Sequence, residues 1–300
     1  MKILLLGANG QLGWQLRRSL AVTGEVTALH RKSEPLCGDL ERPDAVAATV
    51  RQLRPDVIVN AAAYTAVDRA EAERDKAFAI NSAACEMLAR EAGKLGAWLV
   101  HYSTDYVFTG TGERAWSESD ATAPVNAYGE SKLAGERAVI AGTENHVVLR
   151  TSWVFDTWGQ NFLKSILRAA AQRETLNIVS DQWGAPTRAA LIADVTAHIV
   201  KQLRPEVAGL YHLAAGGETN WHAYAQLGIR HALESGMVLK ARPEQVMPIP
   251  ASQYPVAAAR PSNSRLDTRR LRTTFGLELP PWDDGVRAVV SELAALGTLS

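Results

Sequence analysis

The 300-residue chain is 47% hydrophobic, long enough for one large or two modest domains, and its 32 Lys and Arg residues balance its 32 Asp and Glu residues. A net charge of zero excludes a general electrostatic attraction to nucleic acid, and no apolar run reaches the length of a membrane span. Cys37 and Cys85 form no C-x-x-C pair, which argues against a disulfide framework or a zinc site and predicts a cytoplasmic protein.

The first half of the chain alternates short β-rich runs with helical patterns. Nearly continuous apolar runs, typical of parallel strands covered on both faces, occur at 3–6, 26–29, 57–59, 98–102 and 147–149. Helices are expected between them, at 11–21, 43–53, 75–95 and 126–141. This alternation predicts a doubly wound parallel α/β sheet of the Rossmann type, with residues 1–150 forming a dinucleotide-binding domain.

After residue 150 the alternation loosens. Helical patterns at 160–173, 189–203 and 220–235, a strand at 210–213 and a proline-rich loop precede a final pair of helices. These elements predict a smaller, mostly helical C-terminal substrate lobe over residues 151–300, with some segments returning to the first domain.

A glycine-rich turn follows the first strand and opens the first helix. Its sequence, Gly7-Ala-Asn-Gly10-Gln-Leu-Gly13, suits a tight turn, a close approach of backbone to a pyrophosphate, and close packing of helix on strand. The free N–H groups of the helix would then face the phosphates. A glycine triplet alone is equally compatible with an ordinary turn, but its position after the first strand favours a dinucleotide site.

The second strand is followed by three basic residues, His30, Arg31 and Lys32. An acidic residue here would hold the ribose 2′-hydroxyl of NAD, whereas cations pair with the 2′-phosphate of NADP. NADPH is therefore the preferred cofactor; NADH and a merely solvated basic turn remain alternatives. Asp39 and Leu40 are expected beside the adenine.

Tyr128 and Lys132 lie four residues apart on a predicted helix, and hence on one face. A reductase must protonate the alkoxide that forms when hydride reaches a ketone, and a neighbouring ammonium lowers the pKa of a tyrosine toward that task. Thr104 ends an upstream strand, where it can donate a hydrogen bond to the developing oxyanion, with Ser103 as its nearest competitor. Together with the glycines, these residues predict a Thr104, Tyr128, Lys132 catalytic set.

With these features in this order, the chain resembles the extended short-chain dehydrogenase/reductases. Several further motifs resemble the dTDP-4-dehydrorhamnose reductase family within that group: Asn60-Ala-Ala-Ala-Tyr64-Thr-Ala-Val67-Asp68, Tyr102-Ser-Thr-Asp105-Tyr-Val-Phe108, Arg150-Thr-Ser-Trp153, Gly159-Gln-Asn161-Phe, Asp181-Gln-Trp-Gly184-Ala-Pro186-Thr187 and Arg260-Pro261-Ser-Asn263-Ser. The similarity covers essentially the whole chain.

The resemblance implies NADPH-dependent reduction of the C4 ketone of dTDP-6-deoxy-L-lyxo-4-hexulose to dTDP-L-rhamnose, a precursor for cell-surface polysaccharide such as lipopolysaccharide O-antigen. It implies Thr104, Asp105 and Trp153 as contacts of the sugar. The cofactor contacts implied by the turn, the resemblance and the catalytic set are Gly7, Gly10, Gln11, Leu12, Gly13, His30, Arg31, Asp39, Leu40, Ala62, Ala63, Tyr64, Tyr102, Tyr128 and Lys132.

For three of these residues the sequence is also compatible with a role outside substrate binding. Trp153 could stack on a sugar or base, or fill an interface between lobes. Arg260 could clamp a diphosphate or simply be exposed, and Asp105 could cap a loop.

The resemblance also implies a Mg²⁺-bridged homodimer in some relatives, at positions that here carry Gln15, Ala190 and Glu292. Because Mg²⁺ prefers charged oxygen ligands, we expect no metal, and the protein could be a monomer or a homodimer. Other readings of the same fold are a sugar-nucleotide epimerase or dehydratase, or a non-catalytic regulatory subunit of methionine adenosyltransferase. Asp105-Tyr106 after Thr104, in place of Asp-Glu, argues against a dehydratase.

Overall fold

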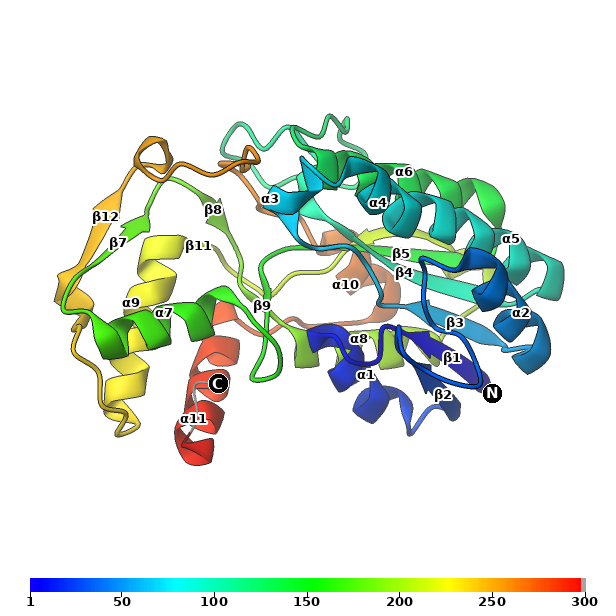
Figure 1. The fold of residues 1–300 in the computed structure, drawn as a ribbon, viewed down its shortest axis with the longest axis horizontal. Coiled ribbons are helices and arrows are strands. Elements are labelled where there is room, and N and C mark those ends of the chain that lie inside the picture. Colours follow the sequence, from blue (N-terminus) through cyan, green and yellow to red (C-terminus); the bar gives the residue numbers. More distant parts are fainter. Residues whose placement is uncertain (298–300) are drawn as a thin grey trace.

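A six-stranded parallel sheet forms the centre of the larger lobe in a computed structural model that describes residues 1–297 (Figure 1). The strands lie in the order β10-β5-β4-β3-β1-β2, and every neighbouring pair is parallel. Their bounds are β1 Lys2–Leu6, β2 Glu25–Leu29, β3 Val57–Asn60, β4 Trp98–Thr104, β5 His146–Thr151 and β10 Gly209–His212. The predicted Rossmann-type sheet is therefore confirmed.

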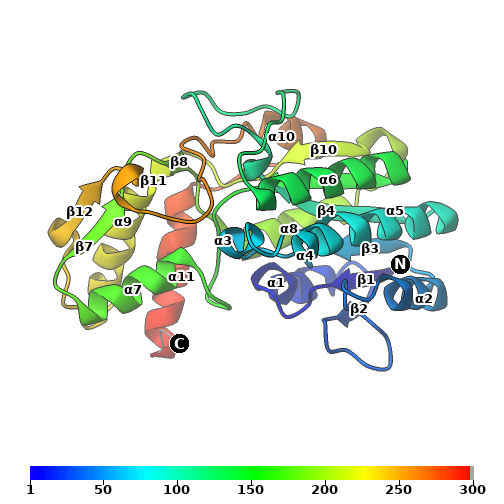
Figure 2. The same cartoon turned by 45° about the horizontal axis from the view of Figure 1, so that its top comes forward.

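Helices cover both faces of the sheet because alternate strand side chains point to opposite faces. Ile3 and Leu5 of β1 pack in one buried cluster, whereas Leu4 and Leu6 pack in the other. The first cluster is completed by α1 Gln11–Leu20, α8 Ala189–Val200 and α10 Arg269–Phe275, and the second by α2 Pro43–Leu53, α5 Ala84–Leu95 and α6 Ala127–Gly142. Figures 1 and 2 show these two helical layers with the sheet between them.

The order of the strands reverses at β1. The chain moves from β1 to β2 on one side and then returns to β3 on the other side. In open α/β sheets the ligand crevice lies at such a switch point, beyond the carboxyl ends of the strands. Gly7 and Ala61–Ala63 follow β1 and β3, so the glycine-rich turn lies at this crevice.

The smaller lobe has its own apolar core, which includes Phe155, Leu167, Tyr224 and Val290. It is built mainly from α7 Phe162–Gln172, α9 Trp221–Glu234, α11 Trp282–Leu296 and the strand pairs β7 Leu176–Val179 with β12 Val246–Ile249 and β8 Trp183–Gly184 with β11 Thr219–Asn220. Figure 1 shows it to the left of the sheet. In the second half of the chain, α8, β10 and α10 pack in the larger lobe.

The helix expected at 75–95 is interrupted. It consists of α4 Arg74–Phe78, a π-helical turn at Ala79–Ala83 and α5. The wider turn brings the backbone close to α6, where a Cβ at Gly135 would lie 1.8 Å from the carbonyl oxygen of Asn81. Local helix propensity does not predict this turn, because the turn depends on a contact with α6, some 50 residues further along the chain.

None of the helices within residues 1–297 has the length and apolar character that crossing a bilayer requires.

Candidate active site

The glycine-rich turn at the end of β1 is shaped by contacts that leave no room for side chains. Gly7 has a φ of +84°, and a Cβ there would lie 2.6 Å from the backbone nitrogen of Ala62. A Cβ on Gly13 would lie 2.0 Å from the carbonyl oxygen of Gly7. Gly10 precedes α1 and offers no side chain to cap its first N–H groups. These free donors and the helix dipole form a ready anion site.

A cavity of about 470 Å³ opens beside this turn. It is lined by Gly7, Asn9, Gly10, His30, Arg31, Lys32, Gly38, Asp39, Leu40, Glu41, Ala61, Ala62, Ala63 and Ile80. Arg31 and Lys32 are exposed and pair with no acidic side chain in the described part of the chain. The cradle, the uncapped helix and the two cations fit an NADP(H) with its pyrophosphate at the turn and its 2′-phosphate beyond β2.

Eight of the expected cofactor residues line this cavity: Gly7, Gly10, His30, Arg31, Asp39, Leu40, Ala62 and Ala63. The others are not among its lining residues: Gln11, Leu12, Gly13, Tyr64, Tyr102, Tyr128 and Lys132. The hydroxyl of Tyr64 donates to Glu73, and that of Tyr102 shares a hydrogen bond of 2.8 Å with Thr196 on α8. Any contact of these two tyrosines with a cofactor would therefore involve atoms other than the hydroxyl.

The expected catalytic residues meet where β4 ends against α6. Thr104 is the last residue of β4, and Tyr128 lies near the start of α6, which packs against this strand. Burial raises the pKa of Tyr128 to about 12, and the contact with Thr104 only partly offsets this rise. A neighbouring positive charge was expected to lower this pKa, but burial acts in the opposite direction and the pKa of Tyr128 is raised.

The ammonium of Lys132 is buried beneath this pair. Its Nζ donates to the carbonyl oxygen of Tyr102 at 2.6 Å and lies 3.4 Å from Nε2 of His101. Burial lowers the pKa of Lys132 and keeps the pKa of His101 well below its usual value. In the tautomer whose Nε2 carries no hydrogen, the neutral imidazole accepts a hydrogen bond from the ammonium, so His101 and the Tyr102 carbonyl together hold Lys132 in place.

Asp105, which directly follows β4, has a buried carboxylate with one oxygen that is not hydrogen-bonded within residues 1–297. Thr104 donates to its Oδ1 at 3.0 Å, but its buried Oδ2 has no partner within residues 1–297. Burial raises the pKa of Asp105 to about 6. A buried carboxylate oxygen without a donor is costly, and a hydroxyl group of a bound sugar would satisfy it.

A second cavity, of about 500 Å³, separates this corner from the smaller lobe. Trp153 lies along it, stacked on Trp221 with ring centroids 3.6 Å apart, and Arg260 enters from the loop before α10. The lining residues include Asp68, Tyr106, Trp153, Phe162, Ser165, Ile166, Gln182, Trp221, Tyr254, Arg260 and Ser264. Aromatic faces with one guanidinium and a few polar groups suit a sugar nucleotide.

Sequence reasoning missed several residues here. Tyr106 packs edge-on against Tyr128 with centroids 5.5 Å apart, and Asp68 pairs with Arg260. Asn81 accepts from the backbone N–H of Tyr64 and donates to Ser131 of α6. Tyr106 directly follows the predicted Thr104-Asp105 pair, so the sequence could have indicated it as a site residue. No sequence pattern indicates Asn81, because its role depends on the π-helical turn.

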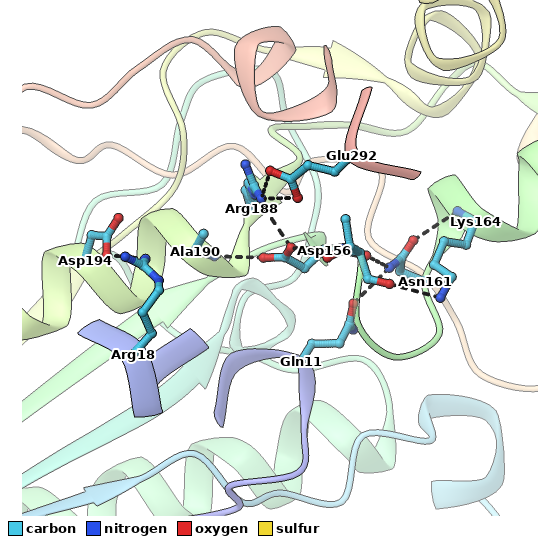
Figure 3. Close-up of polar contacts among 10 residues, drawn as sticks. Gln11, Arg18, Asp156, Asn161, Lys164, Arg188, Ala190, Asp194 and Glu292 are labelled. Atoms are coloured by element: carbon cyan, nitrogen blue, oxygen red, sulfur yellow. Dashed lines mark hydrogen bonds and ion pairs between the residues drawn. The ribbon is translucent and has the colours of Figure 1, made fainter. Parts of the chain in front are cut away.

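Of the three positions matched to a metal site, Ala190 and Glu292 lie on either side of Arg188 and Asp156 near the start of α8 (Figure 3). The carboxylate of Glu292 accepts from Arg188 at 2.7 Å to each oxygen, and the backbone N–H of Ala190 donates to Asp156. No group of three or more His, Cys, Asp or Glu side chains within residues 1–297 is arranged to hold a metal ion.

Comparisons with known proteins find relatives that cover almost the whole chain. The family model described as RmlD substrate binding domain matches residues 1–295. The dTDP-4-dehydrorhamnose reductase of Salmonella typhimurium is 50% identical over 301 residues, covering 100% of both chains, and that of Escherichia coli K12 is 49% identical over 295 residues, covering 98% of both. Among solved structures, the dTDP-4-dehydrorhamnose reductase of Bacillus anthracis in complex with NADP is 33% identical, with a TM-score of 0.88 over 97% of this chain and 99% of that one.

Proposed function

The chain belongs to the family of dTDP-4-dehydrorhamnose reductases, and from that premise we propose how its own residues reduce the C4 ketone of dTDP-6-deoxy-L-lyxo-4-hexulose to dTDP-L-rhamnose with NADPH. The observation that carries the proposal is the position of Tyr128. Its ring packs edge-on against that of Tyr106, which lines the aromatic cleft, with ring centroids 5.5 Å apart, and its helix α6 packs against β4, the strand that ends at Thr104.

Tyr128 is the proposed general acid. NADPH supplies the hydride when bound at the turn after β1. Because burial holds the pKa of Tyr128 near 12, its hydroxyl stays protonated at neutral pH and is able to give its proton to the C4 oxygen as charge develops there. Lys132, held by the carbonyl of Tyr102, provides a nearby positive charge for the tyrosinate that remains.

Thr104 and Asp105 are the proposed contacts of the sugar. The hydroxyl of Thr104 is oriented by the backbone N–H of Tyr106, which donates to it at 3.2 Å, and by its own donation to Asp105. A hydroxyl fixed in this way can turn its proton to the C4 oxygen and stabilise the developing negative charge. The free Oδ2 of Asp105 is then available to accept from a neighbouring sugar hydroxyl.

The preference for NADPH rests on the two exposed cations after β2, Arg31 and Lys32, with His30 beside them. His30 is oriented by the backbone N–H of Lys32, which donates to its Nδ1 at 3.0 Å, and Arg31 and Lys32 extend beside the same cavity. A 2′-phosphate would pair with them. Cys37 and Cys85 are both free thiols, in keeping with the proposed setting in the cytoplasm.

A direct assay tests the proposed activity. The purified protein is mixed with NADPH and the dTDP-4-keto sugar, NADPH absorbance is followed, and the product is identified by its stereochemistry. We expect NADPH consumption with formation of dTDP-L-rhamnose. No consumption, or reduction only of a different nucleotide sugar, would overturn the proposal and would favour a regulatory or epimerase-type protein on the same fold.

A further inference from the structure

A short loop joins the dinucleotide turn to the sugar-nucleotide cleft. The loop spans residues 156–161, between β6 Val154–Phe155 and α7. On one side it contacts the turn, because the indole Nε1 of Trp158 donates to the carbonyl oxygen of Asn9 at 3.0 Å and the ring of Trp158 stacks on that of Trp14. On the other side it leads directly into α7, whose residues Phe162, Ser165 and Ile166 line the cleft.

Asn161 makes a contact in each direction at once. Its Nδ2 donates to the side-chain oxygen of Gln11, the first residue of α1, at 2.9 Å. Its Oδ1 accepts from the backbone N–H of Lys164 at 3.0 Å and so caps the N-terminus of α7. Figure 3 shows Asn161 between Gln11 on one side and Lys164 on the other. The same amide therefore fixes a side chain at the phosphate turn and the start of the cleft helix.

The close approach of the loop to Gln11 depends on a glycine. Gly159 has a φ of +79°, and a Cβ there would lie 2.6 Å from Cγ of Gln11. A side chain at this position would be strained by its backbone and would also push Gln11 away. The backbone of the loop thus packs against the same side chain that Asn161 holds.

The far side of the loop is anchored by a buried carboxylate. Asp156 is fully buried; its Oδ2 accepts from the backbone N–H of Ala190, at the start of α8, and its Oδ1 accepts from that of Thr157. Nε of Arg188 lies 3.6 Å from Oδ1 of Asp156, and the same guanidinium binds Glu292 of α11 (Figure 3). The loop is therefore anchored to both lobes. A displacement of Gln11 would for this reason be passed on to Asn161 and the start of α7.

We propose that Asn161 is a positioning residue that couples the two binding sites, so that the dinucleotide and the sugar nucleotide bind cooperatively. The inference rests on the proposed function only in assigning the dinucleotide to the turn and the sugar nucleotide to the cleft. A dinucleotide that orders Gln11 also orders Asn161 and the first turn of α7. A sugar nucleotide that orders α7 favours the dinucleotide by the same factor, because coupling between two sites is reciprocal.

The test measures dTDP binding by calorimetry, with and without saturating NADP⁺, in wild type and variants. We expect NADP⁺ to tighten dTDP binding by about fivefold or more in the wild type. Asn161→Ser keeps an oxygen that caps α7 but loses the hydrogen bonds from Nδ2 to Gln11 and to the carbonyl oxygen of Asp156, and it should reduce the factor to less than about twofold. Equal dTDP affinity with and without NADP⁺ in the wild type, or full coupling in Asn161→Ser, would overturn the inference.

A matched control separates coupling from helix capping. Asn220 caps α9 by accepting from the backbone N–H of Ala223 at 2.8 Å, and α9 also contributes Trp221 to the cleft. Asn220→Ser should retain the wild-type coupling factor; loss equal to that in Asn161→Ser would show that capping alone matters and would overturn the proposal.

Gly159→Ala provides a second route if Asn161→Ser does not fold, because its added Cβ clashes with Gln11 while Asn161 stays intact. It should also lower the coupling factor, and retained coupling would count against the inference. Each of these results is independent of the reductase assay, so a wild type that turns over without coupling overturns this inference and leaves the proposed function standing.

Discussion

Arg260 donates through one terminal nitrogen to Asp68 at 2.6 Å, while its other terminal nitrogen, Nη1, is buried without a partner in the described residues 1–297. Asp68 belongs to α3 Val67–Ala70 of the larger lobe and also accepts from the backbone N–H of Ala258. One acid thus aims the guanidinium from the loop before α10 into the cleft. A buried donor without an acceptor is costly, and a phosphate oxygen would satisfy it.

Arg260→Gln should therefore weaken binding of the sugar nucleotide. A hydrogen bond to a charged group contributes about 1.5–3 kcal/mol, so we expect the dissociation constant of dTDP to rise about tenfold or more, with NADPH binding unchanged. Calorimetry with each ligand measures both effects. Arg272→Gln, which removes a surface cation paired with Glu278, is the matched control. An unchanged dTDP affinity in Arg260→Gln would remove Arg260 from the binding site.

Tyr128→Phe should abolish most turnover and leave the cofactor site intact. Loss of a general acid typically costs 10²- to 10⁴-fold, and we expect kcat to fall within that range. Steady-state kinetics and NADPH fluorescence titration provide the measurements. Tyr211→Phe, which removes a hydroxyl bound to the carbonyl of Val207, should remain active. Retained turnover in Tyr128→Phe would exclude it as the acid.

The double variant Arg31→Ala with Lys32→Ala should change cofactor preference. Because cations pair with the 2′-phosphate and not with a ribose hydroxyl, KM for NADPH should rise by about tenfold or more while KM for NADH stays near the wild-type value. In the wild type, added salt should reduce the difference between KM for NADPH and KM for NADH, because salt screens the charges of these exposed side chains. The control is Arg204→Ala, an exposed cation beside Glu206. Equal losses for both cofactors would contradict the assignment.

Asp105→Asn should stabilise the fold in a pH-dependent way. Since the pKa of Asp105 is raised from 3.8 to about 6, the folded chain binds more protons than the unfolded chain between these values, and stability falls as pH rises through that window. Removing the charge should gain at most about 3 kcal/mol at pH 7.5 and little at pH 4.

Melting temperatures across pH 4–8 measure this effect, with the exposed Asp75→Asn as control. If the difference in melting temperature between Asp105→Asn and wild type does not grow with pH, the charge of Asp105 does not destabilise the folded protein.

Much of the larger lobe could be predicted because its determinants are local. The apolar runs and the glycine spacing specify strand, turn and helix within a few residues of one another, and the expected strands all occur in the sheet. The Tyr128–Lys132 spacing likewise follows from the pitch of a helix. The surroundings of these residues were not predictable, because burial is set by what packs on them; burial alone reverses the expected direction of the pKa shift of Tyr128.

From its sequence alone, the chain is a Rossmann-type reductase with a phosphate turn at Gly7–Gly13 and a Tyr128–Lys132 pair, since each feature is a pattern over a short stretch. Only the tertiary structure decided that Lys132 rests on the carbonyl of Tyr102, that Trp153 stacks on Trp221, and that Asn161 reaches Gln11 across 150 residues of sequence. Such contacts join segments far apart in the sequence that meet only when the chain folds, and no spacing in the sequence encodes the distance between them.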